Sequence, residues 1–398
     1  MKKIGLTFLA GTLLTGATSF VYFNLPDINS LNYTNNTLAE VKDIKEVIVE
    51  KQPDVFEPIY IEIPEAVKAV YMTACIAGTP SLRKNLVKLI EETELNSVII
   101  DIKDYTGGIA FISEHPELKD KLSKKCYVSD MPEFVKSLNE KGIYVIGRIT
   151  VFQDPLYANL YPEVAVKKDS DRNVIWADYK KINYVDAGSQ QMWDYIVELS
   201  KESRKLGFDE LNFDYIRFPS DGDMRDIYYP FSEEKVVSDP DLGKAKIMRE
   251  FFSYLRNGLE ETGVVMSADL FGMTTTNPDD LNIGQILEYA EPYFDYLSPM
   301  VYPSHYPKGF NGYSNVNDHP YEIVKFSMDR GVIKLKNASS SPLKLRPWLQ
   351  DFDYGGNYGP EEVRAQIQAT YDAGLTSWML WDPSNRYTRE ALESIDLN

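Results

Sequence analysis

Short apolar runs alternate with longer amphipathic segments from about residue 65 to the C-terminus, and this alternation constrains the fold most. Eight of the runs have the length and composition of β-strands, and most are followed by a segment with helical periodicity. The expected strands are 67–74, 97–104, 144–152, 210–218, 264–272, 296–303, 345–352 and 377–382. The pattern predicts an α/β fold of the (β/α)8 TIM-barrel type. An open doubly wound sheet is the alternative, but no Gly-rich phosphate loop follows the first strand.

Two stretches precede the predicted barrel domain, which we place at residues 65–398. Residues 1–25 begin with Lys2 and Lys3 and continue as an uncharged, mostly apolar run, which is typical of a signal peptide or signal-anchor. The run is long enough to span a bilayer and lacks a clear cleavage pattern. These features favour an anchor that holds the barrel on the outer face of the membrane. Residues 26–64 are polar and contain several prolines, so we interpret them as a linker.

The charge balance restricts the partners that we expect. The chain has a formal net charge of −18, which argues against non-specific binding to nucleic acid or to an anionic membrane surface. It contains 27 tyrosines, and tyrosine stacks on flat amphipathic ligands such as sugars, although ordinary packing accounts for most of them. We expect a monomer without a cofactor.

The cysteines and histidines give little support for a zinc site. Cys75 and Cys126 alone cannot build a disulfide framework or a zinc site. Buried free thiols are the favoured interpretation, and a single bridge is the alternative outside the cell. The histidines show no H-E-x-x-H or paired spacing, and the chain has no G-x-S-x-G, P-loop or G-x-G-x-x-G motif.

Polar side chains recur near the C-terminal ends of the predicted strands, where (β/α)8 barrels hold their active sites. Because successive side chains of a strand point to opposite faces, the apolar positions assign each strand an inward and an outward set. The inward or adjoining residues at these ends are Asp101, Lys103, Arg148, Asn212, Asp214, Asp269, Met300, Tyr302, Trp348, Gln350, Trp381 and Asp382. The alternation therefore predicts one pocket lined by charged, amide and aromatic groups.

The fourth predicted strand illustrates the assignment. Leu211, Phe213 and Tyr215 would face the surrounding helices. Asn212 and Asp214 would then face the barrel interior. A buried charge in a strand requires a compensating partner, so we expect a cation close to this carboxylate.

Two carboxylates on neighbouring strands are what the hydrolysis of a glycosidic bond requires. One must be ionised as nucleophile or base, and the other must hold a proton as general acid. We predict that Asp214 is the first and Asp269 the second. A nearby cation would lower the pKa of Asp214, whereas burial would raise that of Asp269. The candidate cations are Arg148, Lys103 and Arg217.

The remaining polar and aromatic residues of the predicted pocket would bind the substrate. Aromatic rings would supply stacking surfaces, and Gln350 would contact a hydroxyl group. The predicted substrate-binding residues are Asp101, Lys103, Arg148, Asn212, Arg217, Tyr302, Trp348, Gln350, Trp381 and Asp382.

Structural interpretations of the two carboxylates remain open. Asp214 could serve only as an ion-pair partner of Arg148 or Arg217. Asp269 could belong to a hydrogen-bond network of the core with Ser267.

Asp101 and Lys103 could likewise form an ion pair that only shapes the pocket. A further alternative is that Asp101, Asp104, Asp214 and Asp269 converge on Mg²⁺ or Ca²⁺.

Several segments around these strand ends occur in a distinctive order. They are SVIIDIKDYTGGIAF, GIYVIGRITVFQDP, WADY, NFDYIRFPSDG, SADLFG, SPMVYPSHY and SWMLWDPSN. Together they resemble the glycoside-hydrolase-like TIM-barrel family known as the DUF4015 group, and the resemblance extends from about residue 67 to the C-terminus. It implies a barrel fold, an extracytoplasmic or envelope setting and a role on polysaccharide.

The α-amylase-like barrels offer a nearby analogy. In those enzymes an Asp at the end of the fourth strand is the nucleophile, and a carboxylic acid at the end of the fifth is the proton donor. Asp214 and Asp269 match these positions by resemblance. The chain departs from those enzymes in carrying Asp on the fifth strand, where they carry Glu.

We therefore predict an extracytoplasmic, endo-acting glycoside hydrolase whose partner is an envelope or extracellular polysaccharide or oligosaccharide. Asp214 would be the nucleophile or base and Asp269 the general acid/base. One alternative is a carbohydrate-binding barrel at the cell surface without turnover, because a fold does not determine a function. The other is a metal-dependent deacetylase or phosphoesterase that uses the Asp cluster.

Overall fold

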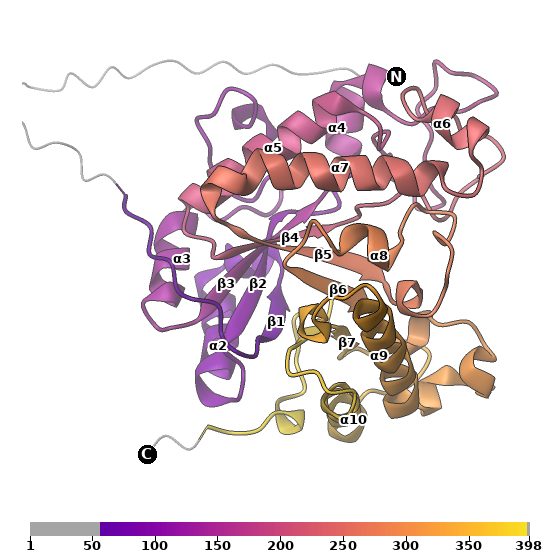
Figure 1. Cartoon of the computed structure of the whole chain (residues 1–398). Helices are drawn as coiled ribbons and strands as arrows, with labels where there is room; N and C mark the ends of the chain where they lie inside the picture. The colour runs from indigo at the N-terminus through magenta and orange to yellow at the C-terminus, as the bar shows by residue number, and fades with distance from the viewer. Residues whose placement is uncertain (1–55, 396–398) are drawn as a thin grey trace, which may run out of the picture. The chain divides into compact units, whose positions relative to one another are not determined.

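A computed structural model describes residues 56–395 and contains a closed barrel of parallel strands in the order β1 to β8, with β8 paired to β1 (Figure 1). The strands are β1 (Lys68–Met72), β2 (Ser97–Lys103), β3 (Tyr144–Thr150), β4 (Glu210–Asp214), β5 (Val265–Phe271), β6 (Tyr296–Met300), β7 (Trp348–Gln350) and β8 (Trp378–Trp381). Each overlaps a predicted strand, and the predicted (β/α)8 TIM barrel is confirmed.

Helices surround the barrel. They are α1 (Ala74–Ala77), α2 (Pro80–Glu92), α3 (Met131–Asn139), α4 (Pro155–Leu160), α5 (Gln190–Lys205), α6 (Glu233–Ser238), α7 (Gly243–Leu259), α8 (Leu287–Ala290), α9 (Pro320–Asn337) and α10 (Pro360–Asp372). The local sequence explains where two of these helices begin. The Ser189 side chain accepts a hydrogen bond from the backbone N–H of Met192 at the start of α5, and the Asp154 side chain caps α4 in the same way. Helices α5 and α7 lie side by side outside the barrel (Figure 1).

The core has two layers, as the strand alternation predicts. Val98 and Ile100 of β2 point outward and pack in the large cluster beneath the helices, and Met266 of β5 does the same. Ile99 and Ile146 point inward and pack with other interior side chains. The barrel is therefore a packed core and not a pore.

Strand β4 ends at Asp214, four residues earlier than the predicted strand 210–218. The next residue, Tyr215, has a φ of 51°, in the left-handed region that bulky residues rarely adopt. This conformation breaks the in-and-out alternation. The prediction that Tyr215 faces the helices is therefore wrong, because its side chain lines the pocket at the open end of the barrel.

Residues 56–64, which we predicted as the end of the linker, belong to the compact unit that begins at Phe56. The backbone N–H of Ile61 donates to Asp209 at 2.8 Å, and Asn139 donates to the carbonyl of Ile59 at 3.0 Å. The predicted leader at residues 1–25 and the rest of the predicted linker lie outside the described residues. None of the helices between residues 56 and 395 has the length and hydropathy needed to cross a bilayer.

Cys75 and Cys126 form a disulfide bond, so the expectation of buried free thiols is wrong. Cys75 lies on α1, directly after β1, and Cys126 lies in the long segment between β2 and α3. Both segments emerge from the C-terminal ends of adjacent strands, and this places the two residues side by side. Cys75 is exposed and Cys126 half-buried. The bond therefore joins the segments that follow β1 and β2, at the end of the barrel that carries the pocket.

Replacing both cysteines with serine should lower the free energy of unfolding by about 2–4 kcal/mol, because the bridge closes a long loop in the unfolded chain. Denaturant unfolding, with and without a reducing agent, would measure the effect. The wild type should lose stability on reduction, and the double variant should not respond. A wild type whose unfolding midpoint is the same under both conditions would contradict the prediction.

Candidate active site

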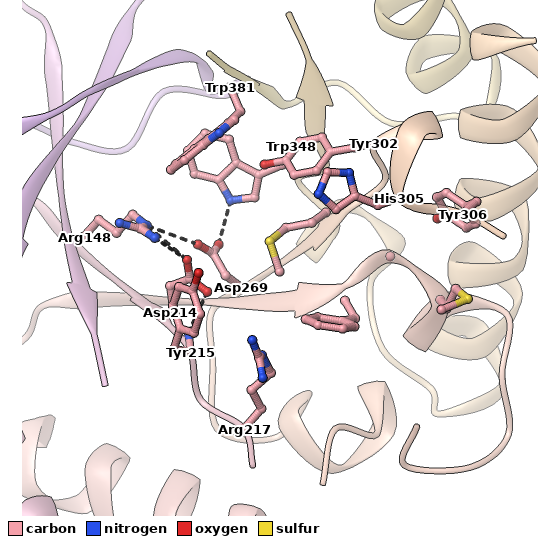
Figure 2. A pocket seen from close by; sticks show the side chains of 14 residues that line it. Arg148, Asp214, Tyr215, Arg217, Asp269, Tyr302, His305, Tyr306, Trp348 and Trp381 are labelled. Atoms are coloured by element: carbon pink, nitrogen blue, oxygen red, sulfur yellow. Dashed lines mark hydrogen bonds and ion pairs between the residues drawn. The ribbon is translucent and has the colours of Figure 1, made fainter. Parts of the chain in front are cut away.

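A cavity of about 340 Å³ lies at the C-terminal end of the barrel, within the size range of small-molecule sites (Figure 2). The predicted site residues that line it are Arg148, Asp214, Arg217, Asp269, Tyr302, Trp348 and Trp381. They come from β3 to β8 or from the segments that directly follow these strands. Strand alternation thus brings together most of the predicted pocket, although the roles of these residues remain predictions.

Arg148 of β3 lies among three carboxylates, which come from β2, β4 and β5. Its Nη1 lies 2.8 Å from Asp101 Oδ1, and its Nη2 lies 2.5 Å from Asp214 Oδ2. Its Nε lies 3.2 Å from the same oxygen of Asp214 and 4.0 Å from Asp269 Oδ2. Burial alone would lower the pKa of Arg148, but Asp214 and Asp101 together raise it well above its ordinary value. The guanidinium therefore remains charged and compensates the acidic cluster.

Asp269 of β5 is buried in a way that favours its protonated form. Burial and then the negative charge of Asp214 raise the pKa of Asp269 well above its usual value. Its Oδ1 accepts two hydrogen bonds, from Asn212 Nδ2 at 2.9 Å and from Trp348 Nε1 at 2.7 Å. The other oxygen, Oδ2, lies 4.0 Å from Arg148 Nε. A neutral carboxyl group held in this manner is suited to general acid catalysis.

Asp214 has a different environment at the end of β4. Its Oδ2 is paired with Arg148, and its Oδ1 accepts a hydrogen bond of 2.6 Å from the backbone N–H of Tyr215. A positive partner and a backbone donor both stabilise a negative carboxylate. The two acidic side chains of the pocket thus differ in their partners, because Asp214 is paired with a guanidinium and Asp269 accepts only neutral N–H donors.

Aromatic rings form a wall of the pocket. Trp381 stacks on Tyr71, with ring centroids 4.0 Å apart and planes 15° from parallel, and it meets Trp348 edge to face at 5.5 Å. Tyr302 also lines the cavity. Flat amphipathic rings next to hydrogen-bonding groups are typical of surfaces that bind sugars.

Two predicted site residues lie behind the pocket, in contact with groups that line it. Asp101 pairs with Arg148 and accepts a hydrogen bond of 2.5 Å from Tyr71 Oη, and burial raises the pKa of Asp101. Asn212 is fully buried and donates to both Ser267 and Asp269. Both can hold pocket side chains in place, but neither lines the cavity, contrary to the prediction that they contact substrate.

Lys103 does not reach the pocket, and this prediction is wrong. The pairing of β2 with β3 has a register shift between Asp101 and Lys103, so strict alternation no longer applies at the end of β2. The Lys103 side chain is completely buried, where its Nζ lies 2.8 Å from Asp154 Oδ2 and also donates to the carbonyl of Thr150. It forms a structural ion pair beside β3.

Gln350 and Asp382 were also predicted to contact substrate, and they too do not line the cavity. The Gln350 side chain accepts from Ser304 Oγ at 2.8 Å and donates to the carbonyl of Phe352 at 2.9 Å, so it supports the segments after β6 and β7. Asp382 accepts hydrogen bonds from the backbone N–H groups of Ser384 and Arg386. It stabilises the turn after β8, a common role of Asp at such junctions.

Sequence reasoning missed several residues that line the cavity, and all of them lie at or beyond the end of a strand. They are Tyr215, Phe271, Gly272, Met273, His305 and Tyr306. The inward and outward alternation of side chains does not extend into the irregular backbone beyond a strand. Four of the missed residues nevertheless belong to the segments SADLFG and SPMVYPSHY. Gly272 cannot be larger, because a Cβ atom at this position would lie 2.5 Å from both Met300 O and Tyr306 Oη.

Acidic groups do not gather in the way that the metal-dependent alternative requires. Between residues 56 and 395, no three His, Cys, Asp or Glu side chains are arranged to hold a metal ion. Asp104, which we considered as a fourth member of the cluster, instead accepts hydrogen bonds from Thr106 within a turn. Arg148 lies among the other three carboxylates.

The chain is similar to known proteins in sequence and in fold. A family model described as "Putative glycosyl hydrolase domain" matches residues 69–387. The glycoside hydrolase domain of PgaB (BpsB) from Bordetella bronchiseptica is 14% identical, with a TM-score of 0.58, over 82% of this chain and 99% of that one. Alpha-L-fucosidase isoenzyme 2 from Paenibacillus thiaminolyticus is 14% identical, with a TM-score of 0.54, over 82% of this chain and 48% of that one.

A hypothetical protein from Ruminiclostridium thermocellum is 32% identical over 50% of this chain and 96% of its own, with a TM-score of 0.43. No curated protein matches the chain. At 14% identity, the likeness to the two enzyme structures concerns the fold.

Proposed function

Because the chain belongs to the glycosyl hydrolase family DUF4015, we propose that it is a glycoside hydrolase that uses Asp214 and Asp269 as its catalytic carboxylates. The observation that carries this proposal is the contrast between the two side chains. They line one cavity, and both lie within 4.0 Å of Arg148 Nε. Asp214 is paired with the Arg148 guanidinium, whereas burial and the charge of Asp214 raise the pKa of Asp269, so the first would act as nucleophile or base and the second as general acid.

The geometry suggests how the reaction would proceed. Asp269 would transfer its proton to the glycosidic oxygen as the bond to the leaving sugar breaks. Asp214 would either attack the anomeric carbon or remove a proton from the water that does so. Arg148 would hold Asp214 in place and keep it charged until the reaction. Asn212 and Trp348 would orient Asp269 through its Oδ1.

We further propose that the substrate is a polysaccharide outside the cytoplasm. The leader expected at residues 1–25 supports this setting. The bond between Cys75 and Cys126 also supports it, because disulfides persist mainly in oxidising compartments.

The proposal is tested by incubating the protein with a panel of polysaccharides and measuring the reducing ends that are released. The Asp214→Asn variant serves as the inactive control. Release of products by the wild type and not by the variant would support hydrolysis. Binding of a glycan by both proteins, with no products from either across the panel, would instead support a carbohydrate-binding barrel without turnover.

Trp348→Phe should move the alkaline limb of the pH profile of kcat/KM to higher pH. The Trp348 N–H donates to Asp269 and so lowers the pKa of that carboxyl group, in opposition to burial. Phenylalanine keeps the ring but has no donor. The pKa of Asp269 should therefore rise further, and the general acid should keep its proton to higher pH.

Trp381→Phe is a matched control for this measurement. Trp381 lines the same cavity, and its ring contacts Tyr71, Trp348 and the guanidinium of Arg148, but it donates no hydrogen bond to Asp269. Its replacement should change KM and leave the alkaline limb in place. If Trp348→Phe leaves the limb unmoved or shifts it to lower pH, Asp269 is not the general acid.

A further inference from the structure

The two arginines that line the cavity differ in their partners. Arg148 is surrounded by Asp101, Asp214 and Asp269. Arg217, in the segment after β4, has no carboxylate of the described residues 56–395 within ion-pair distance. Its side chain extends towards the cavity, apart from the Arg148 cluster (Figure 2). The pocket thus contains one arginine that is fully paired and another that is not.

Arg217 is nevertheless buried, with only 7% of its surface exposed. Its guanidinium group lies 5.0 Å from the ring centre of Tyr215 and 4.9 Å from that of Phe271. Its Nη1 donates to the carbonyl of Phe218 at 2.9 Å. Aromatic contacts and this bond hold the side chain in place, yet a guanidinium has about five N–H donors, so most remain free for a ligand.

A buried cation without a counter-charge is costly, and an anion that enters the cavity would remove much of that cost. The planar guanidinium fork matches the oxygen atoms of a carboxylate or a phosphate.

We propose that the pocket recognises an anionic saccharide, whose carboxylate or phosphate group is bound by Arg217. The inference deepens the proposed function by naming its substrate class, but it concerns binding and can be tested without turnover. The net charge of −18 disfavours non-specific adsorption of acidic polysaccharides to the surface. Affinity for such a ligand would therefore report on a local site.

The test compares saccharides that differ only in charge. The carboxylate probes are oligosaccharides of galacturonate, of mannuronate and of hyaluronan, each paired with its carboxyl-reduced neutral form. The phosphate probe is a phosphorylated mannan oligosaccharide, paired with its dephosphorylated form. Calorimetry with the Asp269→Asn variant would measure affinity without hydrolysis. This background is suitable because burial favours the neutral form of Asp269, so the amide changes the pocket charge little.

In this background, at least one anionic probe should bind roughly ten- to a hundred-fold more tightly than its neutral partner. Arg217→Gln should remove most of that preference, and Arg217→Lys should retain part of it. Arg225→Gln is the matched control, because Arg225 belongs to the same β4–α6 segment but its side chain is 94% exposed. It should leave the preference unchanged.

Equal affinity for the anionic and neutral members of every pair would overturn the inference, as would the failure of every anionic probe to bind. A preference that survives Arg217→Gln would also overturn it. The carboxylate and phosphate arms identify which anion is bound. Hydrolysis of neutral probes alone would leave the proposed function intact and remove this inference. Binding that depends on Arg217, without products from any probe, would support this inference and count against the proposed hydrolysis.

Discussion

Asparagine at position 214 or 269 should lower kcat for glycoside hydrolysis by roughly 10²–10⁴-fold or more, while the barrel remains folded. Asp214→Asn removes the negative charge that would attack or activate water. Asp269→Asn removes the proton that the leaving sugar needs. Both substitutions preserve size, and the amide oxygen at position 269 can still accept from Asn212 and Trp348. Initial rates and circular dichroism spectra would separate lost chemistry from lost structure.

The leaving group distinguishes the two roles. An aryl glycoside with an acidic phenol needs little protonation, so Asp269→Asn should retain much of its activity on that substrate. Asp214→Asn should be inactive on both kinds of substrate. Asp104→Asn is a matched control, because Asp104 does not line the cavity and its side chain accepts hydrogen bonds within a turn. Near wild-type turnover by either active-site variant on a natural glycan would contradict the assignment.

Arg148→Met should lower the free energy of unfolding by about 3–5 kcal/mol and abolish activity. Only 6% of the Arg148 side chain is exposed, so solvent cannot replace its charge. The substitution leaves Asp101, Asp214 and Asp269 close together without a cation. Denaturant titration would measure the loss, with the exposed Arg225→Met as a control that should change nothing measurable.

The loss in Arg148→Met should become smaller as the pH falls. Burial already raises the pKa of Asp101 and of Asp269 in the folded protein, and the arginine opposes both shifts. Without it, the folded-state pKa values rise further above those of the unfolded chain. Protonation at low pH then relieves the repulsion, whereas ionisation at high pH increases it. Arg148→Lys keeps a positive charge and should lose less of the free energy of unfolding than Arg148→Met. A loss in Arg148→Met that does not depend on pH would contradict this account.

Much of the pocket could be predicted because alternation along a strand is a local property. In β4 and β5 the apolar positions are unambiguous, and they assign Asp214 and Asp269 to the inner face. Arg148 follows in the same way from β3. The closed barrel then brings neighbouring strand ends together, so residues far apart in the sequence meet in one cavity.

The errors arise where local regularity stops. The register shift at the end of β2 directs Lys103 to Asp154, and the positive φ of Tyr215 turns its ring into the cavity. The inward position of Gln350 on β7 is occupied by a side chain that bonds to the segments above it. The spacing of these residues in the sequence does not predict these contacts.

The sequence by itself determined the order of the strands, their inner and outer faces and the carboxylates that share a pocket, because these follow from hydrophobic periodicity. Only the tertiary structure decided which charges are compensated. Arg148 and Arg217 have the same side chain and were equal candidates as partners of Asp214. The fold surrounds the first with three carboxylates and the second with aromatic rings. Ion pairing depends on distances of a few ångströms between distant segments, which periodicity does not encode.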